Sequence, residues 1–304
     1  MAVDRREFIR NTTVFGVGVS LAPALLASAG RSYKKLTILH TNDTHSRIDP
    51  FPANDKRYGN RGGVVRRAEL IRRIRNEEEH ILLVDAGDVF QGTPYFNQFK
   101  GELEMKVMQQ MGYDAMTMGN HDFDIGLNGF LTAYSNNATF PVICSNYDFS
   151  DTILNDITIP HKIFKRGEVK IGVFGLGVEL NGLVGKKLYE NTRYLDPVSV
   201  ANEKATFLRH EEKCDLVICL SHLGYAYKTY KISDTSLAEQ TENIDLIIGG
   251  HTHTFLSEPT QLKNKRGESV LVNQVGFGGI NLGRIDFYFG DGERKEHSKL
   301  LRIE

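Results

Sequence analysis

Residues 36–45 read LTILHTNDTH, an apolar run that ends in Asp43 and His45, two side chains able to bind a metal ion. Four further segments repeat this pattern, each with an apolar run of strand length followed at once by Asp, Asn or His. They are ILLVDAGD at residues 81–88, AMTMGNHD at 115–122, LVICLSH at 216–222 and LIIGGHTH at 246–253. Short apolar runs of this kind predict buried β-strands, each with a polar block at its carboxyl end.

In open α/β sheets the loops beyond the carboxyl ends of the strands meet at one crevice, so residues far apart in sequence can share a site. The side chains that this pattern brings together are Asp43, His45, Asp88, Asn120, His222, His251 and His253. Their carboxylate, amide and imidazole groups suit Zn, Mn, Fe or Mg. Paired divalent ions activate water for hydrolysis. We therefore expect a two-metal hydrolytic site in which one carboxylate bridges the ions.

The ordered blocks D-x-H, G-D, G-N-H-D, S-H and G-H-x-H resemble those of the calcineurin-like metallophosphatases, more narrowly the catalytic domain of secreted 5′-nucleotidases and UDP-sugar hydrolases, over residues 34–290. The resemblance implies an α/β fold of two packed sheets flanked by helices, an αββα sandwich. It also implies a phosphoester substrate, whose charge two cations about 3.5–4 Å apart neutralise while hydroxide attacks phosphorus without a phosphoenzyme. It also implies the ligands of each ion. The first ion would take Asp43, His45, Asp88 and His253, and the second would take Asp88, Asn120, His222 and His251, so that Asp88 is the bridge. Relatives often carry Gln or Asn where His253 stands, which leaves the metal preference open.

The third block also contains an imidazole that is not a predicted ligand. His121 follows Asn120 directly, and Asp124 lies three residues further on. The resemblance implies that His121 stabilises the transition state or protonates the leaving oxygen, with Asp124 orienting it and favouring its charged form. Asp122 has the weaker claim of the two carboxylates. The alternative is that His121 only holds a ligand in place.

The rest of the chain follows an α/β pattern without repeats. Apolar periodicity predicts helices at residues 66–75, 102–110, 198–210 and 235–241, and further strands at 157–164, 170–174, 270–273 and 284–289. Residues 276–279, Gly-Phe-Gly-Gly, read as a turn that borders the site, and residues 290–299 read as a charged tail.

The N-terminus predicts export. Arg5 and Arg6 precede Phe8 and an apolar stretch over residues 14–26, which Ala27-Ser28-Ala29 follows. This order is typical of a secretory signal with a small-residue cleavage site, and the paired arginines resemble a twin-arginine signal. We expect residues 1–29 to be removed and the mature chain to be periplasmic or secreted. The apolar stretch is short for a membrane span.

Composition is consistent with one large domain at residues 30–304. The 304 residues are 40% hydrophobic and can bury a substantial core. The formal net charge of −1 argues against binding to a nucleic-acid polymer, which normally requires a basic surplus. The three cysteines, Cys144, Cys214 and Cys219, cannot form a complete disulfide framework and are read as buried thiols.

The sequence therefore predicts an exported phosphoesterase, 5′-nucleotidase-like, that acts on nucleotides or related phosphoesters. The secreted nucleotidases it resembles continue into a second domain that stacks on the base, whereas this chain ends at Glu304. We accordingly expect that domain to be absent and that a separate subunit could supply base specificity. The alternatives are a stand-alone broad phosphatase or phosphodiesterase, a sulfur-ester hydrolase, and a non-catalytic metal-binding module.

Overall fold

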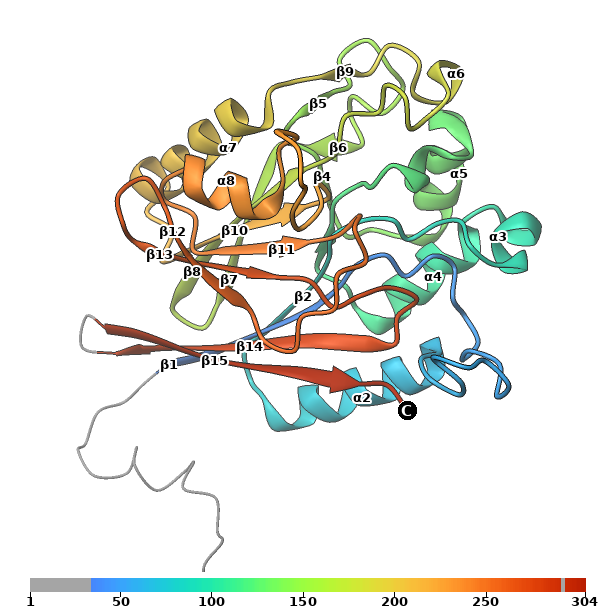
Figure 1. The fold of residues 1–304 in the computed structure, drawn as a ribbon, viewed down its shortest axis with the longest axis horizontal. Coiled ribbons are helices and arrows are strands. Elements are labelled where there is room, and N and C mark those ends of the chain that lie inside the picture. The colour runs from blue at the N-terminus through green and yellow to red at the C-terminus, as the bar shows by residue number, and fades with distance from the viewer. Residues whose placement is uncertain (1–33, 291–292) are drawn as a thin grey trace, which may run out of the picture. The chain divides into compact units, whose positions relative to one another are not determined.

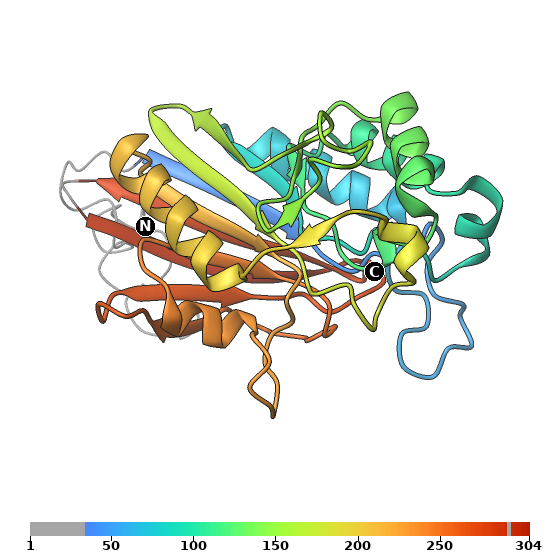
Figure 2. The ribbon, with the colours of Figure 1, turned by 90° about the horizontal axis from the view of Figure 1, so that it is seen from above.

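Two β-sheets pack face to face at the centre of the protein, and helices cover the outer face of each (Figures 1 and 2). The computed structural model describes residues 34–290 and 293–304, and residues from Lys34 onward form one compact unit. The predicted αββα sandwich is confirmed. The predicted export signal at residues 1–29 lies outside the described residues.

The first sheet has seven strands. On one side of β1, four successive strands run parallel to it, and on the other side two strands form an antiparallel ribbon. Its order is β15 (Glu293–Arg302), β14 (Asn281–Gly290), β1 (Lys34–Thr41), β2 (Ile81–Asp85), β3 (Ala115–Met116), β4 (Val142–Ile143) and β6 (Thr158–Ile159). The carboxyl ends of β1, β2 and β3 therefore lie along one edge.

The second sheet has six strands with a parallel centre and antiparallel edges. Its order is β12 (Thr260–Lys263), β13 (Ser269–Asn273), β11 (Leu246–Gly249), β10 (Leu216–Ser221), β8 (Val169–Leu176) and β7 (His161–Arg166). A separate two-stranded ribbon joins β5 (Tyr147–Asp148) to β9 (Arg193–Tyr194).

Three apolar layers account for this stacking. The middle layer joins side chains of both sheets, such as Leu82 of β2 and Ile218 of β10. The outer layers bury α2 (Val64–Glu77), α4 (Glu102–Met111) and α5 (Gly126–Asn137) against the first sheet, and α7 (Pro197–Thr206) and α8 (Asp234–Gln240) against the second. Shorter segments are α3 (Pro94–Phe99), α6 (Lys186–Tyr189), a 3₁₀ turn (His121–Phe123) and a π-helical turn (Phe207–Glu211). Parallel strands buried on both faces explain the unbroken apolar runs of the sequence.

Most predicted elements are present, and two predictions are wrong. The strand expected at residues 157–164 is divided at Pro160, because β6 pairs with β4 in the first sheet while β7 pairs with β8 in the second. The predicted charged tail at residues 290–299 is the other: its residues from Glu293 onward belong to β15, which pairs along its length with β14. All three cysteines are buried and free, as expected. Among the described residues, no helix is long and apolar enough to cross a membrane.

Candidate active site

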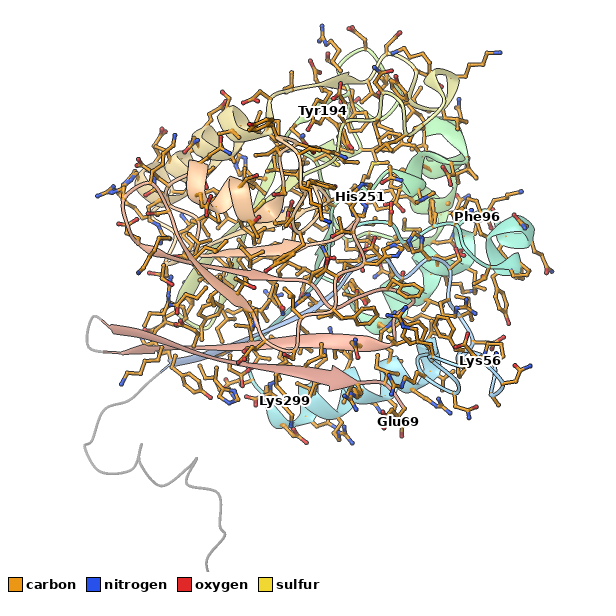
Figure 3. All side chains as sticks on the ribbon, in the orientation of Figure 1. Lys56, Glu69, Phe96, Tyr194, His251 and Lys299 are labelled. Carbon is orange, nitrogen blue, oxygen red and sulfur yellow. The ribbon has the colours of Figure 1, made fainter. Side chains whose placement is uncertain are left out.

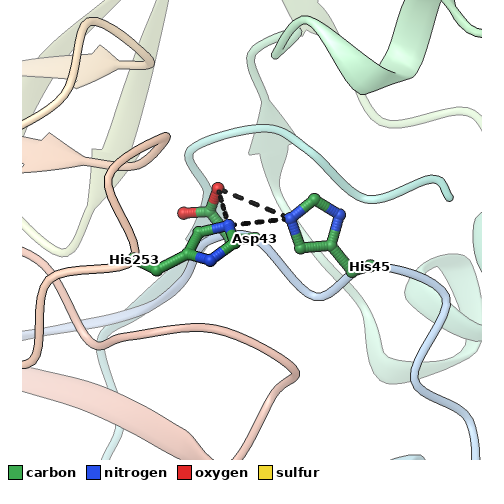
Figure 4. A group of neighbouring side chains, drawn as sticks. All are labelled: Asp43, His45 and His253. Carbon is green, nitrogen blue, oxygen red and sulfur yellow. Dashed lines mark hydrogen bonds and ion pairs between the residues drawn. The ribbon is translucent and has the colours of Figure 1, made fainter. Parts of the chain in front are cut away.

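The seven predicted ligand residues lie together beyond the strand ends of both sheets. The side chains form two groups, and within each group the possible ligand atoms all lie within 4.8 Å of one another. The groups are Asp43 with His45 and His253, and Asp88 with His222 and His251. Figure 4 shows the first group, in which the two imidazoles and the carboxylate face a common point. His251 of the second group follows β11 and is labelled in Figure 3.

Short contacts connect the two groups. Asp88 Oδ2 lies 3.0 Å from His222 Nε2 and 4.0 Å from His45 Nε2, so this carboxylate stands between them. The seventh residue, Asn120, places its Oδ1 atom 2.8 Å from His251 Nδ1. The contacts bring together the side chains that the sequence resemblance divided into two ligand sets, with Asp88 between the two groups.

The backbone at this site is unusual. Five of the seven residues have positive φ angles: Asp43 (49°), His45 (48°), Asp88 (56°), His251 (72°) and His253 (52°). The left-handed region is uncommon for residues with a side chain, although Asp and His enter it more readily than most. Such conformations persist where surrounding contacts over-determine them, and they gather at functional sites.

Two amides that the sequence analysis missed hold the ligand loops in place. Asn42 donates to Asp43 Oδ2 and to the carbonyl of Gly276, both at 2.6 Å, and accepts from the backbone of Val275 at 3.0 Å. Gln274 donates to the carbonyl of Gly250 at 2.6 Å and accepts from the backbone N–H of Thr254. Their partners are mostly backbone groups, which leave no signal in a sequence motif.

Asp122 is a third residue whose structural role the sequence did not indicate. Its carboxylate accepts from four backbone N–H groups, those of Asp88, Val89, Phe90 and Gly119, at 2.8–3.2 Å. Burial and the nearby Asp88 raise the pKa of Asp122 to about 7, while these N–H donors oppose the rise. Asp122 therefore ties the Asp88 loop to the Asn120 loop and does not face the candidate metal site.

The imidazole orientations fit a bound cation. His222 Nδ1 lies 2.7 Å from the carbonyl oxygen of Ala86, which assigns the ring proton to Nδ1 in the neutral tautomer. Its Nε2 is buried, makes no hydrogen bond and points at Asp88 Oδ2. Likewise, His45 Nδ1 is 3.2 Å from the carbonyl of Phe90, and its Nε2 faces His253 Nε2 at 2.9 Å. In the neutral tautomers that these carbonyls favour, Nε2 of His222 and Nε2 of His45 both lie toward the Asp88 carboxylate, an arrangement that a cation between them would stabilise.

The pKa values of His222 and Asp88 also indicate that the site favours a bound cation. Burial alone would lower the pKa of His222, but Asp88 and Asp43 raise it to about 10. Burial likewise would raise the pKa of Asp88, but His222 and His45 bring it well below its ordinary value. Both shifts show that the surroundings of His222 and Asp88 favour positive charge between them. A divalent ion bound there would supply that charge with His222 neutral.

His121 and Asp124 form the pair that the sequence predicted. His121 Nδ1 lies 2.8 Å from Asp124 Oδ2, and the hydrogen bond to Asp124 is the main cause that raises the pKa of His121. The backbone N–H of His121 donates to Asp88 Oδ1 at 2.8 Å, and its ring centroid is 5.4 Å from that of His45. The imidazole therefore borders the metal-binding groups.

The sequence is similar to a known protein family and to individual proteins of known activity. A model described as calcineurin-like phosphoesterase matches residues 36–255, a range that contains all five blocks. A snake venom 5′-nucleotidase from Gloydius brevicauda is 33% identical over 299 residues, which cover 90% of this chain and 48% of that protein. The chain thus spans about half the length of this relative.

Solved structures give the same result. The 5′-nucleotidase precursor from Thermus thermophilus superposes with a TM-score of 0.79 at 31% identity, over 89% of this chain and 55% of that one. The calcineurin-like phosphoesterase YfkN from Bacillus subtilis superposes with a TM-score of 0.73 at 27% identity, over 90% of this chain and 92% of that one.

Proposed function

The chain belongs to the calcineurin-like phosphoesterase family, and from this premise we propose that it is a metal-dependent hydrolase of nucleotide phosphoesters. The observation that carries the proposal is the pair of His–Asp groups joined at Asp88. Nucleotides are the favoured substrate class because the similar proteins from Gloydius brevicauda and Thermus thermophilus are both 5′-nucleotidases.

We assign the ligands as the sequence resemblance implied. One cation would be held by Asp43, His45, Asp88 and His253, and the other by Asp88, Asn120, His222 and His251. Two divalent ions supply neutralisation of the phosphate charge and activation of a water nucleophile. The protein contributes the fixed geometry, since the left-handed loops and the tethers from Asn42 and Gln274 position the ligand atoms before a substrate arrives.

His121 is the proposed general acid. Asp124 holds Nδ1, so Nε2 is the ring atom free to donate a proton to the oxygen that leaves phosphorus. With its side chain 38% exposed, His121 is accessible to a bound substrate. The competing structural role is disfavoured because the backbone of His121, not its ring, makes the contact with Asp88.

Hydrolysis by the purified, Mn- or Zn-loaded chain tests this function. The substrates are AMP, UDP-glucose, a cyclic nucleotide and p-nitrophenyl phosphate. We expect turnover of AMP that disappears in Asp88→Asn and persists in Asp156→Asn, which alters an exposed carboxylate. A chain that binds two ions per molecule and hydrolyses none of the four would contradict the proposal.

Export by the twin-arginine route belongs to the same proposal, on the strength of Arg5, Arg6 and the apolar stretch at residues 14–26. Replacing both arginines by lysine is expected to retain the protein in the cytoplasm, measured by cell fractionation. Normal export of this double variant would exclude that route. The separate specificity subunit stays a prediction, tested by asking whether a partner co-purifies with the chain and raises AMP turnover.

A further inference from the structure

The candidate metal site is open on one side. The side chains of Asp43 and His222 are fully buried, and that of His45 is 12% exposed. In contrast, His253 is 40% exposed and His121 is 38% exposed. A substrate whose phosphate lies among the ligands therefore has its other end on the side where His121 and His253 emerge.

A cluster of aromatic rings begins at His253. The ring of Phe277 stacks on the His253 imidazole, with centroids 5.0 Å apart and planes 13° from parallel. Around Phe277 lie Phe51, Tyr58 and Phe255, with centroids 6.0, 5.4 and 6.1 Å from its own. We call Phe51, Tyr58, Phe255 and Phe277 the ring cluster.

The ring cluster is only partly covered. Phe51 is buried and forms its base, whereas Tyr58 and Phe277 are half-buried. Phe255 is 40% exposed and stacks with Tyr58 at 5.9 Å and 20°. Aromatic surface left exposed beside a polar site is typical of a ligand-binding face, because stability alone would favour covering it.

Backbone hydrogen bonds fix the cluster relative to the metal site. The N–H of Gly278 donates to the carbonyl of Asp43 at 2.7 Å, and the N–H of Gly276 donates to the carbonyl of Thr254 at 2.9 Å. Because Phe277 lies between these two anchors, its backbone is fixed relative to the loops that carry Asp43 and Thr254. This is the Gly-Phe-Gly-Gly turn that the sequence placed at the border of the site.

Two arginines add positive charge to the cluster. The guanidinium carbon of Arg47 lies 4.1 Å from the ring centroid of Phe51, and that of Arg57 lies 5.2 Å from that of Tyr58. Cations over aromatic faces are stable there and remain available to attract an anion. Two carboxylates near Arg47, those of Asp55 and Asp49, offset part of this charge. The arginines therefore add flat guanidinium surface to the rings beside the candidate metal site.

We propose that the ring cluster binds the aromatic base of the substrate nucleotide by stacking while the phosphate lies at the metal site. The inference rests on the proposed function and deepens it, because it assigns base recognition to residues of this chain. The expectation of a separate specificity subunit stays a prediction beside it. Stacking on rings tolerates different bases, since every base presents a π-face.

The test compares AMP with ribose 5-phosphate, which has the same scissile bond and no base. Wild type is expected to show a higher kcat/KM for AMP. Phe255→Ala and Tyr58→Ala should each lower kcat/KM for AMP about tenfold, mainly through KM, and leave ribose 5-phosphate unchanged. Phe255→Tyr should restore the preference. The matched control is Phe99→Ala on α3, a side chain 38% exposed that stacks with Tyr95.

Equal kcat/KM values of wild type for the two substrates, or equal losses on both in the cluster variants, would overturn the inference and leave the phosphoesterase function intact. If the metal-loaded wild type hydrolyses neither substrate, the proposed function fails, and calorimetric binding of a non-hydrolysable phosphonate analogue of AMP decides the inference. Weaker binding by Phe255→Ala than by Phe99→Ala would support base stacking. Equal binding by both variants, or no binding by wild type, would overturn it.

Discussion

The backbone N–H of Asp88 donates to the carboxylate of Asp122 at 3.0 Å, which joins the loop after β2 to the loop after β3. Asp122→Ala removes the acceptor of four buried N–H groups, each of which costs about 1–3 kcal/mol when left unpaired. We therefore expect this variant to lose at least about 3 kcal/mol of unfolding free energy, measured by urea denaturation. Asp124→Asn is the contrasting variant, with near-normal stability. Equal stabilities of the two would contradict this role for Asp122.

Gly119 allows close approach of the ligands. A Cβ atom at this position would lie 2.2 Å from Asp88 Oδ1 and 2.6 Å from His222 Nε2. Gly119→Ala is therefore expected to displace both side chains and reduce bound metal from two ions to fewer per chain, measured by elemental analysis. In Gly185→Ala, the control, the nearest atom is 3.9 Å away. Full metal occupancy in Gly119→Ala would show that the ligands do not require this spacing.

The role of His121 is tested by the leaving group. A general acid contributes about 10²–10⁴-fold when the leaving oxygen needs a proton. His121→Ala should therefore reduce kcat on AMP by that factor and reduce kcat on p-nitrophenyl phosphate far less, since nitrophenolate leaves without protonation. Asp124→Asn should show the same selectivity with a smaller loss. Equal losses of His121→Ala on both substrates would point to transition-state charge stabilisation in place of proton transfer.

Acid sensitivity is expected at Asp286. Burial raises its pKa, but hydrogen bonds from Arg284 at 3.0 Å and Thr37 at 2.8 Å bring it below its ordinary value of 3.8. A carboxyl whose folded pKa is depressed stabilises the fold above its unfolded pKa, and that contribution is lost as pH falls through the folded value. Wild type should thus lose more unfolding free energy than Asp286→Asn between about pH 5 and pH 3.

Denaturation curves at the two pH values measure that difference, with Asp156→Asn as an exposed control. A loss of the same size in wild type and Asp286→Asn would assign the acid sensitivity to other groups.

The sequence predicted the positions of the five polar blocks because buried parallel strands leave long apolar runs. It did not predict β15, because residues 293–302 do not show the alternation of apolar and polar residues that marks a strand. As an edge strand that pairs only with β14, β15 can carry charged residues instead. It also missed α5, where Gly126 and Gly129 weaken helix propensity and packing of Leu127 and Phe130 compensates.

Within the site, the His and Asp residues that converge on the candidate metal site were predictable from residue type and place. Asn42, Asp122 and Gln274 were not, because each bonds backbone groups that only the fold brings near. Hydrogen-bond partners of this kind carry no spacing rule, so a single sequence cannot distinguish them from solvated polar residues.

The left-handed backbone conformations of the loops at the candidate site lower the stability of the fold while they position the side chains for catalysis. Non-glycine residues in this conformation cost on the order of 1 kcal/mol each, and five such residues lie in one site. Glycine at His45 or His251 would relieve this strain and remove a proposed metal ligand. Under selection for thermal robustness alone, the chain would therefore drift toward a more durable and inert molecule, and only continued demand for the reaction keeps these loops as they are.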